Sequence, residues 1–404
     1  MSYYASGTIK PAELEASTYV PGLRATFRFA ANEVYLTNMK LLDIGVYSTT
    51  VNGLARYNEL TGALSCIRRI ALYSDNELLD SVDRFALLAA FENYNKTNDV
   101  SISRSNNLHQ SRWGFVAVPP PGSPDGSIVQ PIGVEKEITD DPTTSGKAYL
   151  SLRDVLPFLA SQVYLPTRIL KNMRLEIEYD AKVANVTPGA AFPLSTIRPH
   201  LSMDVVVDPM TRSKVEKAYQ GARWMAVEVS SVYVPPAANT EQNLAFTLNS
   251  YNNKNVGRLL IVKEAVAGGT RSDHLGSLGS LSMNGESFNA TVNGSQLLPQ
   301  NVAQEAERMA MVSDLFGDSC SPYMGMETNS GGDSIVKNES NLVGLTSYIA
   351  MDVSQKVNNN MQLLYNRVGV AGSPQSNEAM NLVVFGHVSK ALLVQQGKFV
   401  MTYI

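Results

Sequence analysis

The chain has 404 residues, of which 44% are hydrophobic and 17% charged, and its formal net charge is −4. This composition supplies enough apolar side chains for two folded domains and excludes a disordered chain. The lack of a basic excess also excludes tight, sequence-independent binding to nucleic-acid phosphates.

Residues 1–22 are polar and rich in tyrosine, and they end in Val20-Pro21-Gly22, so we predict an N-terminal arm. Ala25, Phe27 and Phe29 then alternate with polar residues, which is the period of a half-buried strand. Further apolar stretches predict strands at residues 34–47 and 64–72. The first half of the chain therefore begins as a β-rich domain.

The period changes at residues 77–93, where Leu78, Val82, Phe85 and Ala89 recur at helical spacing and predict an amphipathic helix with Asn76 as its cap. Residues 119–146 contain a proline-rich run and predict a long loop. A helical turn is expected from Ser151, with Asp154 three residues later as in a capping box.

The clearest strand pattern follows Pro166. Apolar side chains at Met173, Leu175, Ile177 and Tyr179 alternate with charged ones, so one face of this strand enters a core and the other meets water or a neighbouring chain. The charged positions are Arg174, Glu176, Glu178 and Asp180. Residues 201–207 repeat the pattern.

A domain boundary is expected at residues 209–222, where a charged, helix-permissive segment follows Pro209 and Gly221 can end the helix. The second half repeats the order of the first. Strands are predicted near residues 225–234 and 258–262, with hairpin turns at Asn284-Gly285 and Asn293-Gly294. A helix over 302–316 and a loop over 318–340 precede five strand segments: 345–353, 362–370, 382–387, 391–395 and 399–403. Many short strands with turn signals indicate sandwiches or barrels.

Cysteine usage and targeting signals favour maturation inside a cell. Cys66 and Cys320 are the two cysteines, one in each half, so the sequence predicts no disulfide framework and a reducing compartment. The sequence has no basic start followed by an apolar run, so we predict no signal peptide. It also has no stretch that is long and apolar enough to predict a membrane span.

Residues with catalytic or metal-binding potential are scattered. The four histidines, His109, His200, His274 and His387, are widely spaced and predict no metal site. Glu176 and Glu178 could act as an acid/base pair, but a solvated strand face explains them more simply. The sequence has no phosphate-binding or dinucleotide fingerprint. We therefore expect no enzyme activity, no catalytic residues and no cofactor.

Several stretches of the sequence, taken together and in this order, resemble the double jelly-roll major capsid proteins of polinton-like viruses, virophages and tectivirus-like phages. They are residues 67–72 (IRRIAL) with 75–80 (DNELLD), 152–159 (LRDVLPFL) with 165–179 (LPTRILKNMRLEIEY), and 292–299 (VNGSQLLP) followed by a helix and 315–317 (LFG). Together with the apolar strand that ends the sequence, they cover most of the chain.

The resemblance implies a mainly β fold, a double jelly-roll of two tandem eight-stranded β-sandwiches with short inserted helices. We expect an arm at 1–22, the first jelly roll at 23–208, a linker helix at 209–222 and the second jelly roll at 223–404. The implied function is a major capsid protein whose homotrimers form pseudo-hexagonal capsomers of an icosahedral DNA virus shell. Such a protein resides in the virion and is assembled in the interior of the host cell.

The expected partners are copies of the chain itself, in the homotrimer and in neighbouring capsomers, together with penton and minor capsid proteins. An internal membrane beneath the shell fits the same reading, whereas direct sequence-specific contact with nucleic acid is not expected. One alternative is a minor virion component such as a penton or spike. Another is a carbohydrate-binding module or β-sandwich hydrolase, which would need an exposed aromatic platform, and the two tryptophans, Trp113 and Trp224, both stand in strand-like contexts.

Overall fold

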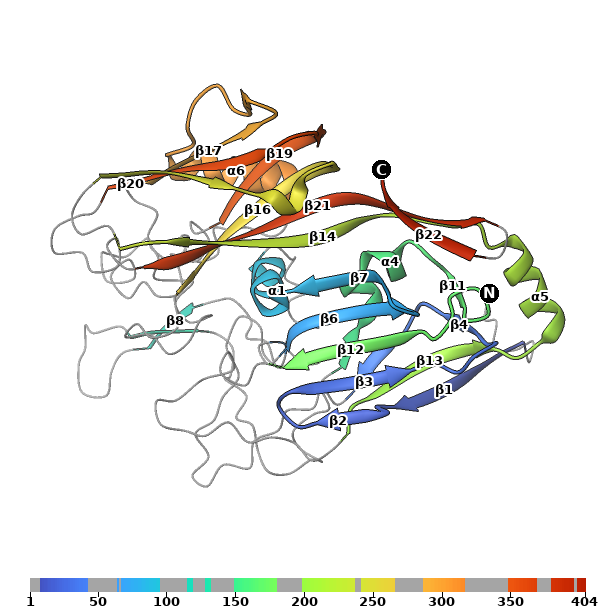
Figure 1. Cartoon of the computed structure of the whole chain (residues 1–404). Helices are drawn as coiled ribbons and strands as arrows, with labels where there is room; N and C mark the ends of the chain where they lie inside the picture. The colour runs from blue at the N-terminus through green and yellow to red at the C-terminus, as the bar shows by residue number, and fades with distance from the viewer. Residues whose placement is uncertain are drawn as a thin grey trace.

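In the computed structural model of the chain, the structure describes residues 8–42, 64, 67–94, 115–118, 128–131, 149–179, 198–236, 241–265, 286–316, 348–368, 379–395 and 398–404. Strands dominate these residues, and they form two antiparallel β-sandwiches that lie one above the other in Figure 1. The first is drawn in blue to green and the second in yellow-green to red.

The first sandwich has a six-stranded and a five-stranded sheet. The six-stranded sheet contains β1 (Ile9–Glu15), β4 (Val34–Leu36), β5 (Lys40–Leu42), β10 (Tyr149–Ser151), β11 (Tyr164–Pro166) and β13 (His200–Val206). The five-stranded sheet contains β2 (Thr18–Val20), β3 (Arg24–Arg28), β12 (Arg174–Tyr179), β6 (Ile67–Ser74) and β7 (Glu77–Asp83). Its helices are α1 (Phe85–Tyr94), α3 (Leu152–Val155) and α4 (Pro157–Ala160).

The second sandwich follows α5 (Pro209–Ala218) and has a five-stranded and a four-stranded sheet. The five-stranded sheet contains β14 (Gly221–Val234), β21 (Met380–Gln395), β16 (Lys254–Ala265), β19 (Tyr348–Val357) and β22 (Lys398–Tyr403). The four-stranded sheet contains β15 (Glu241–Thr247), β20 (Met361–Val368), β17 (Glu286–Val292) and β18 (Ser295–Gln296). A 3₁₀ turn η3 (Asn249–Tyr251), helix α6 (Glu305–Phe316) and a separate hairpin of β8 (Phe115–Val118) with β9 (Ile128–Pro131) complete the elements.

Both sandwiches have the same strand order. In the first sandwich, the short strands β4 and β5 both pair with β13, so together they occupy one position in the sheet. On their other side β4 pairs with β11 and β5 pairs with β10, so β11 and β10 together occupy the next position. We count such positions along each half of the chain and leave out β2 and β22, which add to the sheets at β3 and β21, and the separate β8–β9 hairpin. One sheet then runs first–eighth–third–sixth and the other second–seventh–fourth–fifth. This order is β1–β13–β4/β5–β11/β10 with β3–β12–β6–β7, and then β14–β21–β16–β19 with β15–β20–β17–β18. The chain thus contains one eight-strand topology twice.

Local sequence explains the clearest elements. In β12 the buried residues Leu175, Ile177 and Tyr179 alternate with half-exposed ones, as the pattern predicted. Asn293 and Gly294 both adopt positive φ angles, 54° and 85°, and connect β17 to β18 in the predicted hairpin turn. Asn284-Gly285, the other predicted turn, lies outside the described residues, as does the predicted loop over 318–340.

The structure differs from the predicted N-terminal arm at residues 9–20. All seven residues of β1 pair with β13, and β2 pairs with β3. The segment is polar because β1, among the described strands, pairs with β13 alone and buries mainly Ile9, with Ala12 and Leu14 partly covered. Its Pro11 fits such an edge position, where a missing N–H costs little.

The helix predicted over 77–93 is wrong in its first part. Residues 77–83 form β7, which pairs with β6 across a turn at Asp75, where φ is 49°. Leu79 and Val82 are buried, as a core-facing pattern requires, but they are buried by pairing in the sheet and not by a helix. Of the predicted segment, the part that is helical is α1. Asn76, the predicted cap, therefore lies in the turn between two strands.

Smaller differences concern element ends. Ser151 precedes α3 but makes no side-chain capping bond, and α6 starts at Glu305 because Val302 forms a β-bridge with Phe288. Gly221 does not end α5 but opens β14. The strands predicted at 382–387 and 391–395 are one continuous strand, β21. Within the predicted loop over 119–146, residues 128–131 form β9, and the remainder lies outside the described residues.

One apolar core joins the two sandwiches. A single cluster of buried side chains runs from Ala25 and Phe27 in the first sandwich to Leu260 and Phe385 in the second. Figure 1 shows β7 and α1 beneath β14, so the five-stranded sheet of each sandwich is involved in the contact. The two sandwiches are therefore packed against each other rather than linked only by α5.

Candidate functional site: a polar sheet face and the junction between the sandwiches

The outward face of β3, β12 and β6 carries a group of ordered polar side chains. We call it the polar face, and it consists of Arg24, Thr26, Arg28, Arg69, Tyr73, Arg174, Glu176 and Glu178. The alternate residues of these strands, such as Phe27, Leu175 and Ile70, are fully buried in the first sandwich. Strand alternation thus separates an apolar inner face from a polar outer face.

Strand register arranges opposite charges in a row across this face. Arg24 pairs with Glu178, Glu178 with Arg69, and Arg69 with Asp83 of β7. Cross-strand neighbours of opposite charge attract one another, whereas like charges would repel. The row therefore alternates positive and negative across four strands.

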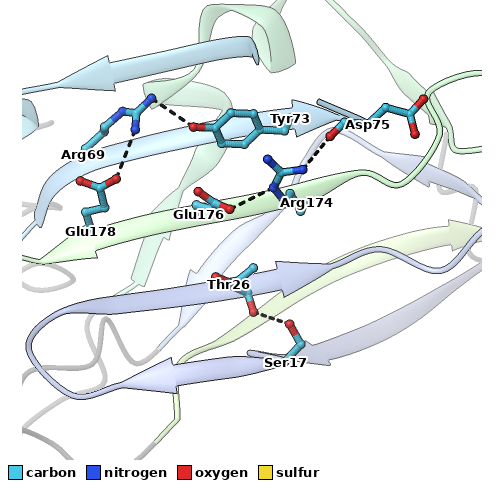
Figure 2. Close-up of polar contacts among 8 residues, drawn as sticks. All are labelled: Ser17, Thr26, Arg69, Tyr73, Asp75, Arg174, Glu176 and Glu178. Carbon is cyan, nitrogen blue, oxygen red and sulfur yellow. Dashed lines mark hydrogen bonds and ion pairs between the residues drawn. The ribbon is translucent and has the colours of Figure 1, made fainter. Parts of the chain in front are cut away.

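Arg174 is the most constrained side chain of the polar face. Figure 2 shows its guanidinium between Glu176, which accepts from Nε at 2.9 Å, and the carbonyl oxygen of Asp75, which accepts from Nη1 at 2.6 Å. The guanidinium also lies over the ring of Tyr73, 4.2 Å from its centroid. These contacts fix the charge in place before any partner arrives.

Arg69 is held in a similar way. Its Nη1 donates to Oε1 of Glu178 and its Nη2 to the hydroxyl of Tyr73, each at 3.2 Å (Figure 2). Burial alone would lower the pKa of Arg69, but Tyr73 and Glu178 outweigh burial and raise that pKa above its ordinary value. Elsewhere in the view, Ser17 Oγ donates to the carbonyl oxygen of Thr26 at 2.8 Å and ties the β1–β2 connection to β3.

The second feature is the junction, which we define as the contact between the two sandwiches; β7 and α4 pack on β14 there. Phe158 of α4 is fully buried and meets Trp224 of β14 edge to face, with 4.9 Å between ring centroids. Two of the largest ring types therefore anchor one sandwich on the other.

Asp80 is fully buried beside these rings. Its carboxylate accepts from the backbone N–H of Phe158 at 2.7 Å and of Ser81 at 3.1 Å. Burial raises the pKa of Asp80 to about 7, although the two N–H donors and the positive charge of Lys390 oppose the rise. A buried carboxyl group that titrates near neutrality therefore lies between the sandwiches.

Lys390, on β21, belongs to a charged group at the same junction. Its Nζ lies 3.6 Å from Oε1 of Glu228 and 5.1 Å from the ring centroid of Tyr403. Lys254 also pairs with Glu228 and lies over the ring of Tyr403, whose hydroxyl donates to Glu228 at 2.6 Å. The group connects the last strand, β22, to the junction.

A second polar link crosses between the sandwiches at Arg84, the residue between β7 and α1. Its Nη1 lies 2.9 Å from Oε1 of Glu264 on β16, and Glu264 is 4% exposed. Arg84 has a positive φ of 52°, which a non-glycine residue adopts only at a cost. Arg84, four residues after Asp80, thus faces an opposite charge from the second sandwich.

The second sandwich also buries an ion pair within its own core. Lys263 of β16 pairs with Glu286 of β17, and the hydroxyl of Tyr365 donates to Glu286 at 2.8 Å. Burial lowers the pKa of Lys263, and Glu286 opposes that effect. The pair joins the two sheets of the sandwich, because β16 and β17 belong to different sheets.

The residues considered from sequence fall as follows. Glu176 and Glu178 each pair with an arginine rather than with each other, so the structure does not bring them together as an acid/base pair. His200 is half-buried on β13, and His387 is half-buried on β21 with its ring centroid 5.7 Å from that of Phe316. Trp224 belongs to the junction. His109, His274, Cys66, Cys320 and Trp113 lie outside the described residues.

Sequence reasoning missed Asp80, Arg84, Lys390 and Glu264. A usable signal existed for two of them: Asp80 follows Leu78-Leu79, and Lys390 interrupts the apolar run of β21. Within the described ranges, no three His, Cys, Asp or Glu side chains gather in a way that could hold a metal ion. In the same part of the chain, no helix is long and apolar enough to cross a membrane.

No protein-family model matches the sequence, and no curated protein matches it. Solved structures do resemble the chain. PBCV-1 Vp54, fitted into a cryo-EM reconstruction of the virophage Sputnik, matches with a TM-score of 0.58 at 11% identity, over 98% of this chain and 96% of that one.

Two further structures agree. The Faustovirus major capsid protein matches with a TM-score of 0.57 at 9% identity, over 96% of this chain and 90% of the other. The mavirus major capsid protein gives a TM-score of 0.50 at 10% identity, over 98% and 90%. Together with the repeated eight-strand order, these likenesses show that the chain has the double jelly-roll fold, as the sequence predicted.

Proposed function

We propose that this chain is a major capsid protein whose homotrimers form pseudo-hexagonal capsomers of an icosahedral DNA virus shell. The observation that carries the proposal is that the chain repeats one eight-strand order in tandem and resembles capsid-protein structures over nearly their full length. Three such chains contribute six sandwiches, and six similar wedges in a ring form a near-hexagonal outline. Its place in the cell would then be the virion, assembled in the host interior.

The junction supports this role. A capsomer must present its six sandwiches in fixed directions, so the two sandwiches of one chain must not swing freely. Phe158 and Trp224 pack across the junction, and Arg84 pairs with Glu264 there. The shared apolar core makes each chain one rigid double wedge.

The polar face supports contacts between copies. Its charged side chains are of both signs, and Arg69 and Arg174 are already held by Glu178 and Glu176, so a partner that meets these four loses less side-chain entropy on binding. We propose that this face meets a neighbouring copy of the chain. A penton, a minor capsid protein and a membrane beneath the shell are further partners expected of the same role.

The division of the chain into a first jelly roll at 23–208, a linker helix at 209–222 and a second at 223–404 is part of this proposal. Pairing supports it, because among the described strands β1–β13 pair with one another and β14–β22 pair with one another. Two boundaries are adjusted in the proposal: residues 9–20 are counted with the first jelly roll, because β1 pairs with β13 and β2 with β3, and residues 221–222 with the second, because they belong to β14. The pair Arg69–Glu178 joins two strands and the pair Arg84–Glu264 joins the two sandwiches, which fits a structural rather than an enzymatic protein.

Negative-stain electron microscopy of the purified chain tests the proposal. Class averages with six lobes in a near-hexagonal outline, and flat hexagonal arrays at high protein concentration, are the expected result. Particles with the outline of one double wedge and no arrays at any concentration would contradict it. That outcome would favour a minor virion component.

A further inference from the structure

A buried amine and a buried carboxyl group face each other between the two sheets of the second sandwich. Lys263 of β16 is 1% exposed and Glu286 of β17 is 4% exposed, and Nζ of Lys263 contacts Oε2 of Glu286. The two residues are 23 positions apart, and their strands belong to different sheets. Taking both charges out of water is costly, and an apolar pair of similar volume often stabilises a core as well. The pair therefore calls for a reason beyond packing.

The groups around the pair favour a neutral amine and hold the carboxyl group. The hydroxyl of Tyr365 donates to Oε1 of Glu286 at 2.8 Å, so both carboxyl oxygens are in contact with a donor. Arg367 stands directly across the ladder from Glu286, and both Arg367 and Arg308 of α6 are buried. Burial lowers the pKa of Lys263, Glu286 opposes that effect, and the charges of Arg308 and Arg367 add to the lowering. Lys263 therefore gives up its proton more readily than a lysine in water.

We propose that Lys263 and Glu286 condense into an intramolecular isopeptide bond, which joins the two sheets of the second sandwich covalently. Lys263 first passes a proton to Oε2, and the lone pair of the neutral Nζ then attacks Cδ of Glu286. The hydroxyl of Tyr365 stabilises the negative charge that develops on Oε1. The Cδ–Oε2 bond breaks, and Oε2 leaves as water with the first proton and a second one from Nζ. An ammonium and a carboxylate thus become one amide and one water molecule, and no other reactant enters.

The fold supplies the conditions that this reaction lacks in free solution. Strand pairing holds the amine against the carboxyl group, which replaces an encounter between two dilute groups. Burial makes the neutral amine accessible and strengthens the effect of nearby positive charge on the developing oxyanion. The bond goes beyond the proposed function, because it forms within one chain whether or not copies associate.

The chain contains a matched control for this site. Lys254 contacts Oε2 of Glu228, and the hydroxyl of Tyr403 donates to Oε1 of Glu228 at 2.6 Å, so the same three groups meet in the same arrangement. The side chains of Lys254 and Glu228 are each 16% exposed, however, and water reaches them. An ammonium and a carboxylate that keep water contact stay ionised, so we expect no bond at this second site.

Mass spectrometry of the purified full-length chain, unfolded in denaturant and then digested, tests the proposal. The intact chain should be lighter than its sequence by one water molecule, and the peptide that carries Lys263 should be attached to the one that carries Glu286. Lys254 and Glu228 should appear in separate peptides. A native chain of full sequence mass, with Lys263 and Glu286 in separate peptides, would overturn the proposal. The native chain alone decides this point, whether or not any variant folds.

Three variants locate the bond and its chemistry. Lys263→Met should restore the full mass, whereas Lys254→Met should still lose one water. Tyr365→Phe removes the donor to Oε1, so the bond should form about a hundredfold more slowly, seen as an unlinked fraction that becomes linked on standing. A loss of water that persists in Lys263→Met would overturn the assignment, and Tyr365→Phe chains linked as fast as native ones would contradict the role of Tyr365. None of these outcomes bears on whether the chain forms trimers.

Discussion

At the scale of single residues, a close contact at Gly386 fixes the centre of the second sandwich. A Cβ atom there would lie 2.2 Å from Cε1 of Tyr251, whose hydroxyl donates to the carbonyl oxygens of Glu228 at 3.0 Å and Val384 at 2.9 Å. Glycine is thus required by the ring that ties β14 to β21.

We predict that Gly386→Ala lowers the free energy of unfolding by about 3 kcal/mol, because the methyl group displaces the Tyr251 ring and breaks its hydrogen bonds. Gly294→Ala is the matched control: it has φ 85° but open space around its Cβ position, and should cost about 1 kcal/mol. Urea unfolding of the three chains measures both values. Equal costs would show that the contact with Tyr251 is unimportant.

His387 gives a prediction about acid stability. Burial, assisted by the charge of Arg258, lowers the pKa of His387 to about 4, and within the described residues its Nε2 has no hydrogen-bond partner. The unfolded chain binds this proton below pH 6.5 and the folded chain does not until about pH 4, so His387 reduces stability as the pH falls through that window.

Between pH 7 and pH 5 this loss amounts to about 2 kcal/mol. His387→Phe should remove it, so the variant should lose less stability than the native chain over the same interval. Asp80, whose pKa is raised by burial, makes the folded chain more stable as the pH falls. This contribution is the same in both chains and therefore cancels in the comparison. The midpoints of urea unfolding at pH 7 and pH 5 measure this loss in each chain. An identical pH dependence in both chains would refute the account of His387.

At the scale of elements, sequence patterns predicted strands well where alternation was strict. β12 matches its prediction, because it has one face in the core and one outside. β13 matches only as far as Met203, because beyond it Asp204 and Val206 are buried and Val205 is half-exposed. The helix predicted at residues 77–83 was wrong for a physical reason. β7 buries two consecutive residues, Leu79 and Asp80, together with Val82, so the strict alternation of a strand is broken and the apolar residues fall at helical spacing. β1 was missed because an edge strand buries little.

The candidate site was harder to foresee than the strands. The charged face of β12 was predicted to meet water or a neighbouring chain, but its ordering depends on the register with β3 and β6, which a single sequence does not reveal. The junction joins residues such as Asp80 and Lys390 that are far apart in the chain, so no local pattern announces it.

A double-mutant cycle tests whether α4 and β14 couple the sandwiches. Phe158→Leu and Trp224→Phe each weaken the edge-to-face contact, and we expect a coupling energy of about 1 kcal/mol with a single unfolding transition in every chain. Thermal unfolding followed by circular dichroism and by calorimetry supplies the numbers. Two separate transitions in the native chain would mean that the sandwiches fold independently.

The polar face gives a prediction about assembly. Arg69→Glu turns the row Arg24–Glu178–Arg69–Asp83 from alternating to mostly acidic, so contact with a neighbouring copy should weaken about tenfold or more while the fold persists. The exchange Arg69→Glu with Glu178→Arg restores opposite charges within this pair and the net charge of the row, and it should recover part of the loss. Lys10→Glu, an exposed change on β1, is the control. Analytical ultracentrifugation compares them, and unaltered association in Arg69→Glu would place the contact elsewhere.

At the scale of the whole molecule, the repeated strand order and the shared core make two sandwiches into one body. The two halves share their strand order, but their exposed faces differ. The polar face belongs to the first sandwich, and the strand that ends the described chain, β22, belongs to the second. Copies of such a body can close a ring only by joining unlike faces, which is a head-to-tail contact.

The measurement that tests the central claim most directly is the mass of the purified chain in solution, determined by light scattering at micromolar concentration. The account predicts a stable particle with three times the 43.9 kDa mass of one chain. A monodisperse particle of one chain mass, unchanged as the concentration rises, would contradict it.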